Sequence, residues 1–112
     1  MRELFHPDPH EFSLPTVFHA LSDPIRLEIV RTLASTSEQS CGWFDFKLTK
    51  STLSHHFRVL REAGVIRTRM AGTQRFISLR QEDLEARFPG LLVLILHDAS
   101  SHEQPELPAE SS

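Results

Sequence analysis

The sequence predicts one small α+β domain, mainly α-helical, that carries a single β-hairpin. Apolar residues recur with the 3.6-residue period of helices in several stretches before residue 64. Two alternating segments on either side of Gly72 have the period and the turn residue of a hairpin. With 112 residues, the chain is long enough for a single modest core. These observations together define the fold class.

The first two helices are predicted to follow each other closely. Apolar residues repeat at i, i+3, i+4 and i+7 over residues 13–21, which predicts the first helix. Asp23 suits an N-cap, and Pro24 suits the first helical position, where its missing N–H costs nothing. A second helix is therefore predicted over residues 24–34, and residues 35–40 are predicted to form a polar loop.

A third helix is predicted over about residues 50–63. Apolar residues at positions 53, 57 and 60 form its core stripe, while the other side carries hydroxyls, histidines and arginines. Thr49 is a plausible N-cap, and Gly64 suits the left-handed position that ends a helix. Residues 41–46, just before it, are predicted to form one or two helical turns. Their three aromatic side chains belong either to the core or to a small-molecule pocket.

A β-hairpin is predicted directly after the third helix, over residues 65–70 and 74–79. Gly72 marks its turn. Two sets of residues alternate along it: Ile66, Thr68, Met70, Phe76 and Ser78 in one, and Arg67, Arg69, Arg75 and Ile77 in the other. Helix, short turn, basic helix and arginine-flanked hairpin follow the order of a winged helix-turn-helix.

The ends of the chain are predicted to differ from the domain between them. Residues 1–12 contain two prolines and several charges, which predicts a flexible arm. After an acidic helix over residues 81–88, an apolar helix begins at Leu91. Residues 99–112 are polar, acidic and proline-containing, which predicts a disordered tail. The folded domain is therefore expected over residues 13–98.

Positive charge is concentrated in one third of the chain. The net charge of −3 would by itself argue against a nucleic-acid-binding protein. Residues 47–80, however, contain eight basic residues and one acid, Glu62, so this segment carries +7. Such a segment is typical of the electrostatic footprint of a DNA-binding surface. An enzyme has no need of it, and no nucleophile–base–orienter set is present, so no enzymatic activity is predicted.

Two long stretches resemble the ArsR/SmtB family of bacterial winged-helix repressors. They are FHALSDPIRLEIVRTLA and KSTLSHHFRVLREAGVIRTRMAGTQRFISL, and the resemblance runs from about residue 16 to residue 79. It implies a homodimer formed by the N- and C-terminal helices that binds double-stranded operator DNA. It also implies release of the DNA by an inducer, which in this family is often a metal ion.

The metal sites that the resemblance implies are not matched. Metal-sensing members commonly carry Cys-x-Cys before the recognition helix, whereas this chain has only Cys41 there. Others carry carboxylates and histidines on the last helix, with a spacing that His97 and His102 do not reproduce. A nitrogen and oxygen metal site would form only if the arm folded onto the last helix, bringing together His6, His10, His97 and His102. Otherwise these are scattered solvent-exposed histidines, and no cofactor is predicted.

The predicted DNA-binding residues lie on the third helix and the hairpin. The helix, residues 50–63, would enter the major groove, and the hairpin, residues 66–79, would contact backbone or minor groove. His56 is either such a contact or a hydrogen-bonded structural histidine, and the hairpin arginines are otherwise ordinary surface charge. The predicted contacts are Lys50, Ser51, Thr52, Ser54, His55, His56, Arg58, Arg61, Arg67, Arg69, Gln74 and Arg75.

A dimer interface is predicted because the last helix is apolar on every side. A terminal helix of a small monomer can bury only one side, so the other needs a second chain. The residues predicted for this interface are Leu14, Val17, Phe18, Leu91, Leu92, Leu94 and Ile95.

Cys41 is the only cysteine, which excludes an internal disulfide. It is either a half-buried structural residue or a sensor whose oxidation would release DNA. The N-terminus lacks the apolar core of a signal peptide, and the longest apolar run, residues 91–96, is too short to cross a bilayer. A cytoplasmic repressor with an unknown inducer and no membrane partner is therefore predicted.

Overall fold

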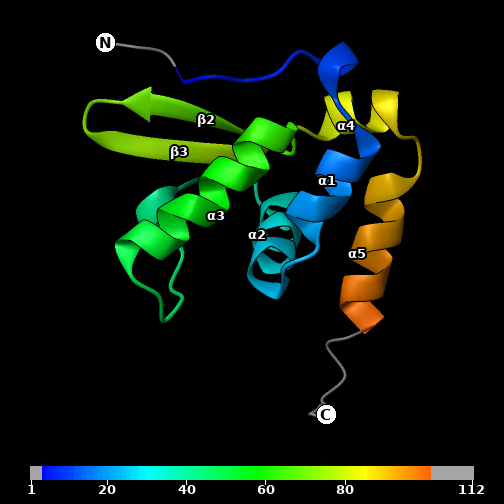
Figure 1. Cartoon of the computed structure of the whole chain (residues 1–112). Helices are drawn as coiled ribbons and strands as arrows, with labels where there is room; N and C mark the ends of the chain where they lie inside the picture. Colours follow the sequence, from blue (N-terminus) through cyan, green and yellow to red (C-terminus); the bar gives the residue numbers. More distant parts are fainter. Residues whose placement is uncertain (1–3, 102–112) are drawn as a thin grey trace.

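The computed structural model describes residues 4–101 and confirms a mainly α-helical winged fold (Figure 1). Its elements, in chain order, are the 3-10 turn η1 (Pro9–Glu11), α1 (Leu14–Leu21), α2 (Pro24–Ser35), β1 (Glu38–Ser40), the 3-10 turn η2 (Cys41–Trp43), α3 (Lys50–Ala63), β2 (Ile66–Ala71), β3 (Gln74–Leu79), α4 (Gln81–Arg87) and α5 (Leu91–Ser101). The β2–β3 hairpin and α5 lie at opposite sides of the molecule, with α1, α2 and α3 between them (Figure 1).

The helix ends follow the residues that predicted them. Both Ile25 and Arg26 donate backbone N–H groups to the carboxylate of Asp23 at the start of α2. The hydroxyl of Thr49 accepts the N–H of Thr52 at 3.1 Å and so caps α3. Gly64 ends α3 with a φ of +91°, a conformation that costs glycine little. The bounds of the third helix are therefore as predicted.

The sheet has three antiparallel strands in the order β1-β3-β2, one more than predicted. Residues 38–40, predicted as loop, pair with β3, opposite Ser78, Ile77 and Phe76. The three residues of β1 are polar and show no hydrophobic alternation, so this strand can be recognised only from its pairing with β3. The predicted faces of β3 were wrong as well. Thr68 pairs with Ile77, which is fully buried, so Ile77 belongs to the inner set and Phe76 to the outer set.

The segment before α3 is less helical than predicted. Only residues 41–43 form a 3-10 turn, and residues 44–49 contain no helical turn. The rings of Phe44 and Phe46 stack with centroids 6.3 Å apart and planes 7° apart. Residues two apart point to the same side only in an extended chain, so this stacking excludes a helix here.

The core lies where α2, α3 and the hairpin meet. Its largest fully buried side chains include Ile29 from α2, Leu60 from α3, and Ile66 and Ile77 from the hairpin. Removing each such side chain from water is worth about 1.5–3 kcal/mol. This packing fixes α3 against the hairpin and leaves its opposite side exposed. Among residues 4–101 there is no helix both long and apolar enough to cross a membrane.

Residues 4–12 lie against the domain, where the sequence predicted a flexible arm. Phe12 is 4% exposed and packs into the core. Three arginines donate hydrogen bonds to carbonyl groups of this segment: Arg61 to Phe5 at 3.0 Å, Arg80 to Pro7 at 2.8 Å and Arg87 to Pro9 at 2.8 Å. The partners are 56 to 78 residues apart in the chain, so no local pattern could reveal them.

Candidate nucleic-acid interface

The outer face of α3 presents most of the side chains predicted to contact DNA. The exposed ones are Lys50, Ser51, Thr52, Ser54, His55 and Arg58. The guanidinium of Arg58 lies 3.1 Å from Nδ1 of His55, one helical turn earlier. The capping threonine donates its hydroxyl proton to the Thr52 hydroxyl oxygen at 2.9 Å. This face therefore offers short polar side chains and two cations, with its backbone close to the surface.

His56 lies inside the protein and not on this face. It is 9% exposed, and its Nδ1 lies 3.0 Å from Nη1 of Arg26 and 3.9 Å from Oδ2 of Asp23. An arginine can only donate, so Nδ1 must accept and the proton is on Nε2. Of the two interpretations that the sequence left open, the structure supports the structural histidine. The prediction that it contacts DNA is corrected.

Arg26 is a central residue of this network that the sequence analysis missed. It is 8% exposed, and its Nε donates to the carbonyl of Ala20 at 2.6 Å. Its Nη2 reaches the carbonyl of His19 at 3.4 Å, so it holds the end of α1, α2 and α3 together. A signal was present, because positions 26, 29 or 30, and 33 lie on the apolar stripe of α2. A cation on such a stripe is expected to have buried partners.

Arg61 is less available to DNA than predicted. Its side chain is only 12% exposed, and its Nε donates to the carbonyl of Phe5. Nη2 lies 3.8 Å from Glu62. Its hydrogen bond to Phe5 therefore holds the N-terminal segment in place.

The outer face of the hairpin carries two arginines that already have acidic partners. Arg69 donates two hydrogen bonds to Glu38, at 2.8 and 3.0 Å, and its guanidinium lies 4.9 Å from the centroid of the Phe76 ring. This bidentate contact lowers the pKa of Glu38. Arg67 is 3.8 Å from Asp83 and more than half exposed. These pairs partly neutralise the outer face, which the sequence predicted to be freely cationic.

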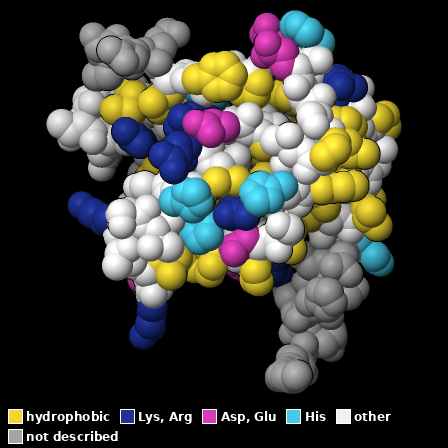
Figure 2. Space-filling view, in the orientation of Figure 1, with side chains coloured by type: hydrophobic (Ala, Val, Ile, Leu, Met, Phe, Trp, Pro, Cys, Tyr) yellow, Lys and Arg dark blue, Asp and Glu magenta, His cyan; other side chains and the backbone are white. Residues whose placement is uncertain are grey.

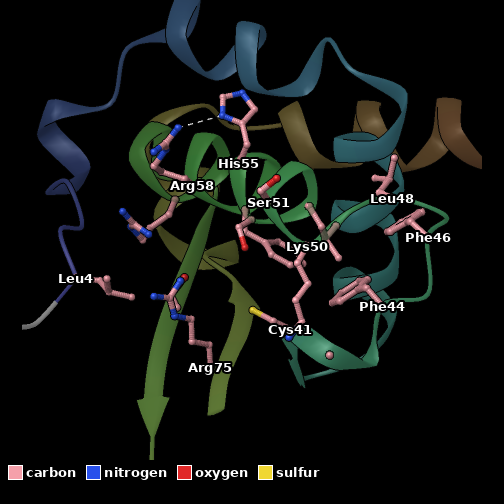
Figure 3. Close-up of a pocket in the computed structure, with 16 residues that line it drawn as sticks. Leu4, Cys41, Phe44, Phe46, Leu48, Lys50, Ser51, His55, Arg58 and Arg75 are labelled. Carbon is pink, nitrogen blue, oxygen red and sulfur yellow. Dashed lines mark hydrogen bonds between the residues drawn. The ribbon is translucent and has the colours of Figure 1, made fainter. Parts of the chain in front are cut away.

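Arg75 differs from the two outer arginines because it lies on the other face of the hairpin. It is exposed and pairs with Met70, next to the exposed Gln74 at the tip. In Figure 3 it points toward the space between the hairpin and α3. The register therefore separates the predicted wing arginines into two groups with different surroundings.

A groove of about 900 Å³ lies between α3, the hairpin and the segment before α3 (Figure 3). Four cations line it: Lys50, Arg58, Arg61 and Arg75. Among the described residues that line it there is no carboxylate. A concave surface with one sign of charge concentrates the field and attracts anions such as phosphate. The groove therefore joins the exposed face of α3 to the inner face of the hairpin.

Cys41 lines the same groove and is half-buried. Burial raises the pKa of its thiol, and the charge of Arg75 opposes this only in part. A reactive sensor thiol needs the reverse, a lowered pKa and easy access. The surroundings of Cys41 thus favour the structural interpretation over the oxidation sensor.

The histidines considered for a metal site are not brought together. In the part of the chain that the structure describes, no three His, Cys, Asp or Glu side chains are placed to hold a metal ion. His10 is exposed in η1, His97 lies on α5, and His102 lies outside the described residues. His6 has another role, since its Nε2 accepts the backbone N–H of Thr68 at 2.9 Å.

Because His6 accepts a hydrogen bond from Thr68, we expect the attachment of the N-terminal segment to depend on pH. Burial, with the charges of Arg80, Arg61 and Arg67, lowers the pKa of His6 from its usual 6.5. The released or unfolded segment therefore binds the proton more tightly than the docked one. The stabilisation that the His6 contact gives to the docked segment is complete above pH 6.5. It is lost as the pH falls through the lowered pKa of His6. A protonated Nε2 could no longer accept the N–H of Thr68.

Urea unfolding between about pH 5 and 8 would measure this effect. His6→Gln, whose Oε1 can accept the same N–H, is expected to flatten the part of the stability profile that His6 causes. The exposed His10→Gln is the matched control and should keep it. An unchanged profile in His6→Gln would contradict the role of the His6 contact.

The residues predicted for the dimer interface differ in burial, and two of them, Leu91 and Ile95, are half-buried against the core. Val17 (0% exposed) and Leu92 (4%) are already buried within the single chain, so they have no surface to offer a partner. Figure 2 shows hydrophobic side chains gathered over α1 and α5. The large apolar side chains exposed on these helices are Leu14, Phe18, Val93 and Leu94, of which Val93 was not predicted.

Comparison with known proteins identifies the family. The family model "Bacterial regulatory protein, arsR family" matches residues 23–68. The chain is 44% identical over 79 residues to the uncharacterized HTH-type transcriptional regulator YceK of Bacillus subtilis, covering 68% of this chain and 79% of that protein. It is 34% identical over 73 residues to the arsenical resistance operon repressor of Staphylococcus xylosus, covering 64% and 70%.

A solved structure agrees with these sequence relatives. The transcriptional repressor BigR from Xylella fastidiosa is 31% identical and matches with a TM-score of 0.54, covering 67% of this chain and 85% of that one. The winged helix-turn-helix fold, the family model and the relatives thus all indicate the same class of transcriptional regulator. The chain belongs to the ArsR family of bacterial regulatory proteins.

Proposed function

We propose that this regulator is a homodimeric repressor that binds double-stranded operator DNA with α3 in the major groove. The hairpin would contact the adjacent backbone or minor groove. The observation that carries the proposal is the exposed polar and cationic face of α3, continuous with a groove lined by four cations and no described carboxylate. Repression, as against activation, is supported by two relatives that are named repressors.

The roles of the side chains follow from their positions. Short hydroxyl side chains such as Ser51 and Ser54 allow the backbone of α3 to approach base edges. Arg58 can bind guanine or phosphate, and Arg75 reaches the same groove from the hairpin. Arg69 and Arg61 contribute less than the sequence suggested. Arg69 is paired with the carboxylate of Glu38, and the Arg61 side chain is largely buried and bonded to the carbonyl of Phe5. His56, on the buried side of α3, holds the helix against α2 through Arg26.

The exposed apolar surface of α1 and α5 supports the homodimer. Phe18, Val93 and Leu94 are each more than half exposed, an unfavourable arrangement for an isolated small domain. Burial of this surface between two chains would place two α3 helices on successive major grooves, about 34–36 Å apart. The expected operator is therefore nearly palindromic.

Salt-dependent binding tests the DNA contacts. An operator is first obtained by selecting bound duplexes from a random pool, and light scattering should give two chains per duplex. Arg58→Ala and Arg75→Ala are each expected to lose about 1–3 kcal/mol of affinity and, where the contact is to phosphate, to lower the salt slope by about 0.9.

Arg31→Ala is the control for these variants. Arg31 lies on α2 and does not line the groove, yet its removal changes the net charge equally. Its operator affinity should stay close to that of the unaltered protein. Equal losses in all three variants would reduce the effect to net charge and contradict the proposed interface. Unaltered affinity of Arg58→Ala and Arg75→Ala at several salt concentrations would do the same.

A further inference from the structure

The groove beside α3 has two chemically different ends. Figure 3 shows Arg58, Arg75 and Leu4 toward one end, and Phe44, Phe46 and Leu48 toward the other. Its volume of about 900 Å³ lies within the usual range of small-molecule sites. The groove is therefore large enough for an organic molecule with two unlike parts.

The cationic end calls for an anion. Arg75 points toward this end from β3 (Figure 3). Arg58 of α3 and Arg61 add positive charge along the groove, while their guanidinium groups contact His55 and the carbonyl of Phe5. The described lining contains no carboxylate that could neutralise them. A carboxylate or sulfonate at this end would form charge-assisted hydrogen bonds with guanidinium groups, which suit planar anions.

The apolar end is not explained by DNA. Phe44 is buried in the core, where it stacks on Phe46 and meets the ring of Phe57 edge-on, with the Phe44 and Phe57 centroids 5.6 Å apart. Phe46 is only partly buried against this core. Leu48 is 38% exposed beside them. A duplex backbone offers charged phosphates and sugars to a groove and has no extended apolar part that would bury such side chains. An apolar body attached to the anion would do so.

We propose that this groove is an effector site for a small organic anion with an apolar body. The anionic group binds at Arg75, and the body lies over Phe46 and Leu48. The effector releases operator DNA by direct competition, because it fills the groove beside α3 and occupies Arg75, which the duplex needs. This second step rests on the proposed function, whereas binding to the groove does not.

Trp43 provides the readout for the DNA-free protein. It is the only tryptophan, the chain has no tyrosine, and its ring contacts Phe44 edge-on with centroids 5.2 Å apart. The tryptophan emission therefore reports on the apolar end of the groove. Decanoate is the probe, because it combines a carboxylate with an apolar chain and does not absorb near the indole band. Decanol and inorganic sulfate test the apolar and anionic parts separately.

Decanoate is expected to change the Trp43 emission until the site is saturated, with a Kd below about 1 mM. Decanol and sulfate are each expected to bind with a Kd at least about tenfold higher. Arg75→Gln should weaken decanoate binding about fivefold to tenfold. Arg67→Gln, on the outer face of the same hairpin, is the matched control and should bind decanoate normally. Thermal unfolding verifies that both variants fold, and Arg75→Met replaces Arg75→Gln if that variant does not.

Three results would overturn the site. Equal binding of decanol would indicate a general apolar surface, and equal binding of sulfate would indicate simple ion pairing. Equal decanoate affinity in Arg75→Gln and Arg67→Gln would remove the anion contact. A second titration, of decanoate into a preformed operator complex, tests competition. Decanoate binding without release of DNA would reject the competition, and failure to obtain an operator would count against the proposed function only.

Discussion

Gly64→Ala is expected to lower the free energy of unfolding by about 2–5 kcal/mol. Two causes add at this position. Gly64 has a φ of +91°, which disfavours a residue with a Cβ, and that Cβ would overlap the ring of Phe12. Phe12 is buried at the end of the N-terminal segment, so it has little room to move. The end of the recognition helix and the N-terminal segment are thus packed through one glycine.

Two other glycines separate the causes of this loss. Gly72 has a φ of +63°, and a Cβ added there would meet no atom within 4 Å, so Gly72→Ala should show only the backbone cost, about 1–2 kcal/mol. Gly42 has equal space and no positive φ, so Gly42→Ala should change stability little. Urea unfolding followed by circular dichroism measures all three. If Gly64→Ala costs no more than Gly72→Ala, the contact with Phe12 is unimportant.

Arg26→Met is expected to destabilise the protein by about 2–4 kcal/mol. The substitution keeps most of the side-chain volume but removes every donor of the buried guanidinium. The carbonyl of Ala20 and Nδ1 of His56 would then lose their partners at a site shielded from water. Unpaired buried polar groups are costly, and this set joins α1, α2 and α3. Arg31→Met is the control and should cost much less, because Arg31, also on α2, is only half-buried and its partner Glu28 keeps access to water.

His56 tests the same network from the recognition helix. His56→Asn can place a carbonyl oxygen near the position of Nδ1 and accept from Arg26, whereas His56→Leu cannot. We expect His56→Leu to be clearly less stable than His56→Asn in urea unfolding, and to bind operator more weakly because α3 is less firmly held. Equal stability of the two variants would show that the accepting nitrogen of His56 contributes nothing.

The recognition helix shows how far local sequence patterns extend. Its bounds, its cap at Thr49 and its end at Gly64 follow from residues within or next to the helix. Its exposed and buried faces follow from the 3.6-residue period, with the exception of His56. That residue lies at the border between the faces, so only the position of Arg26, 30 residues away, decides that it points inward.

The wing shows where such patterns end. The hairpin and its turn were predictable because alternation and Gly72 are local features. The faces of β3 were not, since both Phe76 and Ile77 are apolar and only packing against the helical core, α2 included, selects Ile77. The pairing of β1 with β3, and of Glu38 with Arg69 across the sheet, required the same knowledge of the third dimension.

The sequence by itself determined the class of this protein: a small winged domain whose basic segment surrounds one polar helix. Those features depend on residues a few positions apart, where helix caps, periodicity and turn residues act. The tertiary structure decided which of the many basic side chains remain available. Arg61 and Arg69 are engaged, His56 is buried, and Arg58 and Arg75 face a shared groove, because charge pairing and burial depend on partners that are distant in the chain.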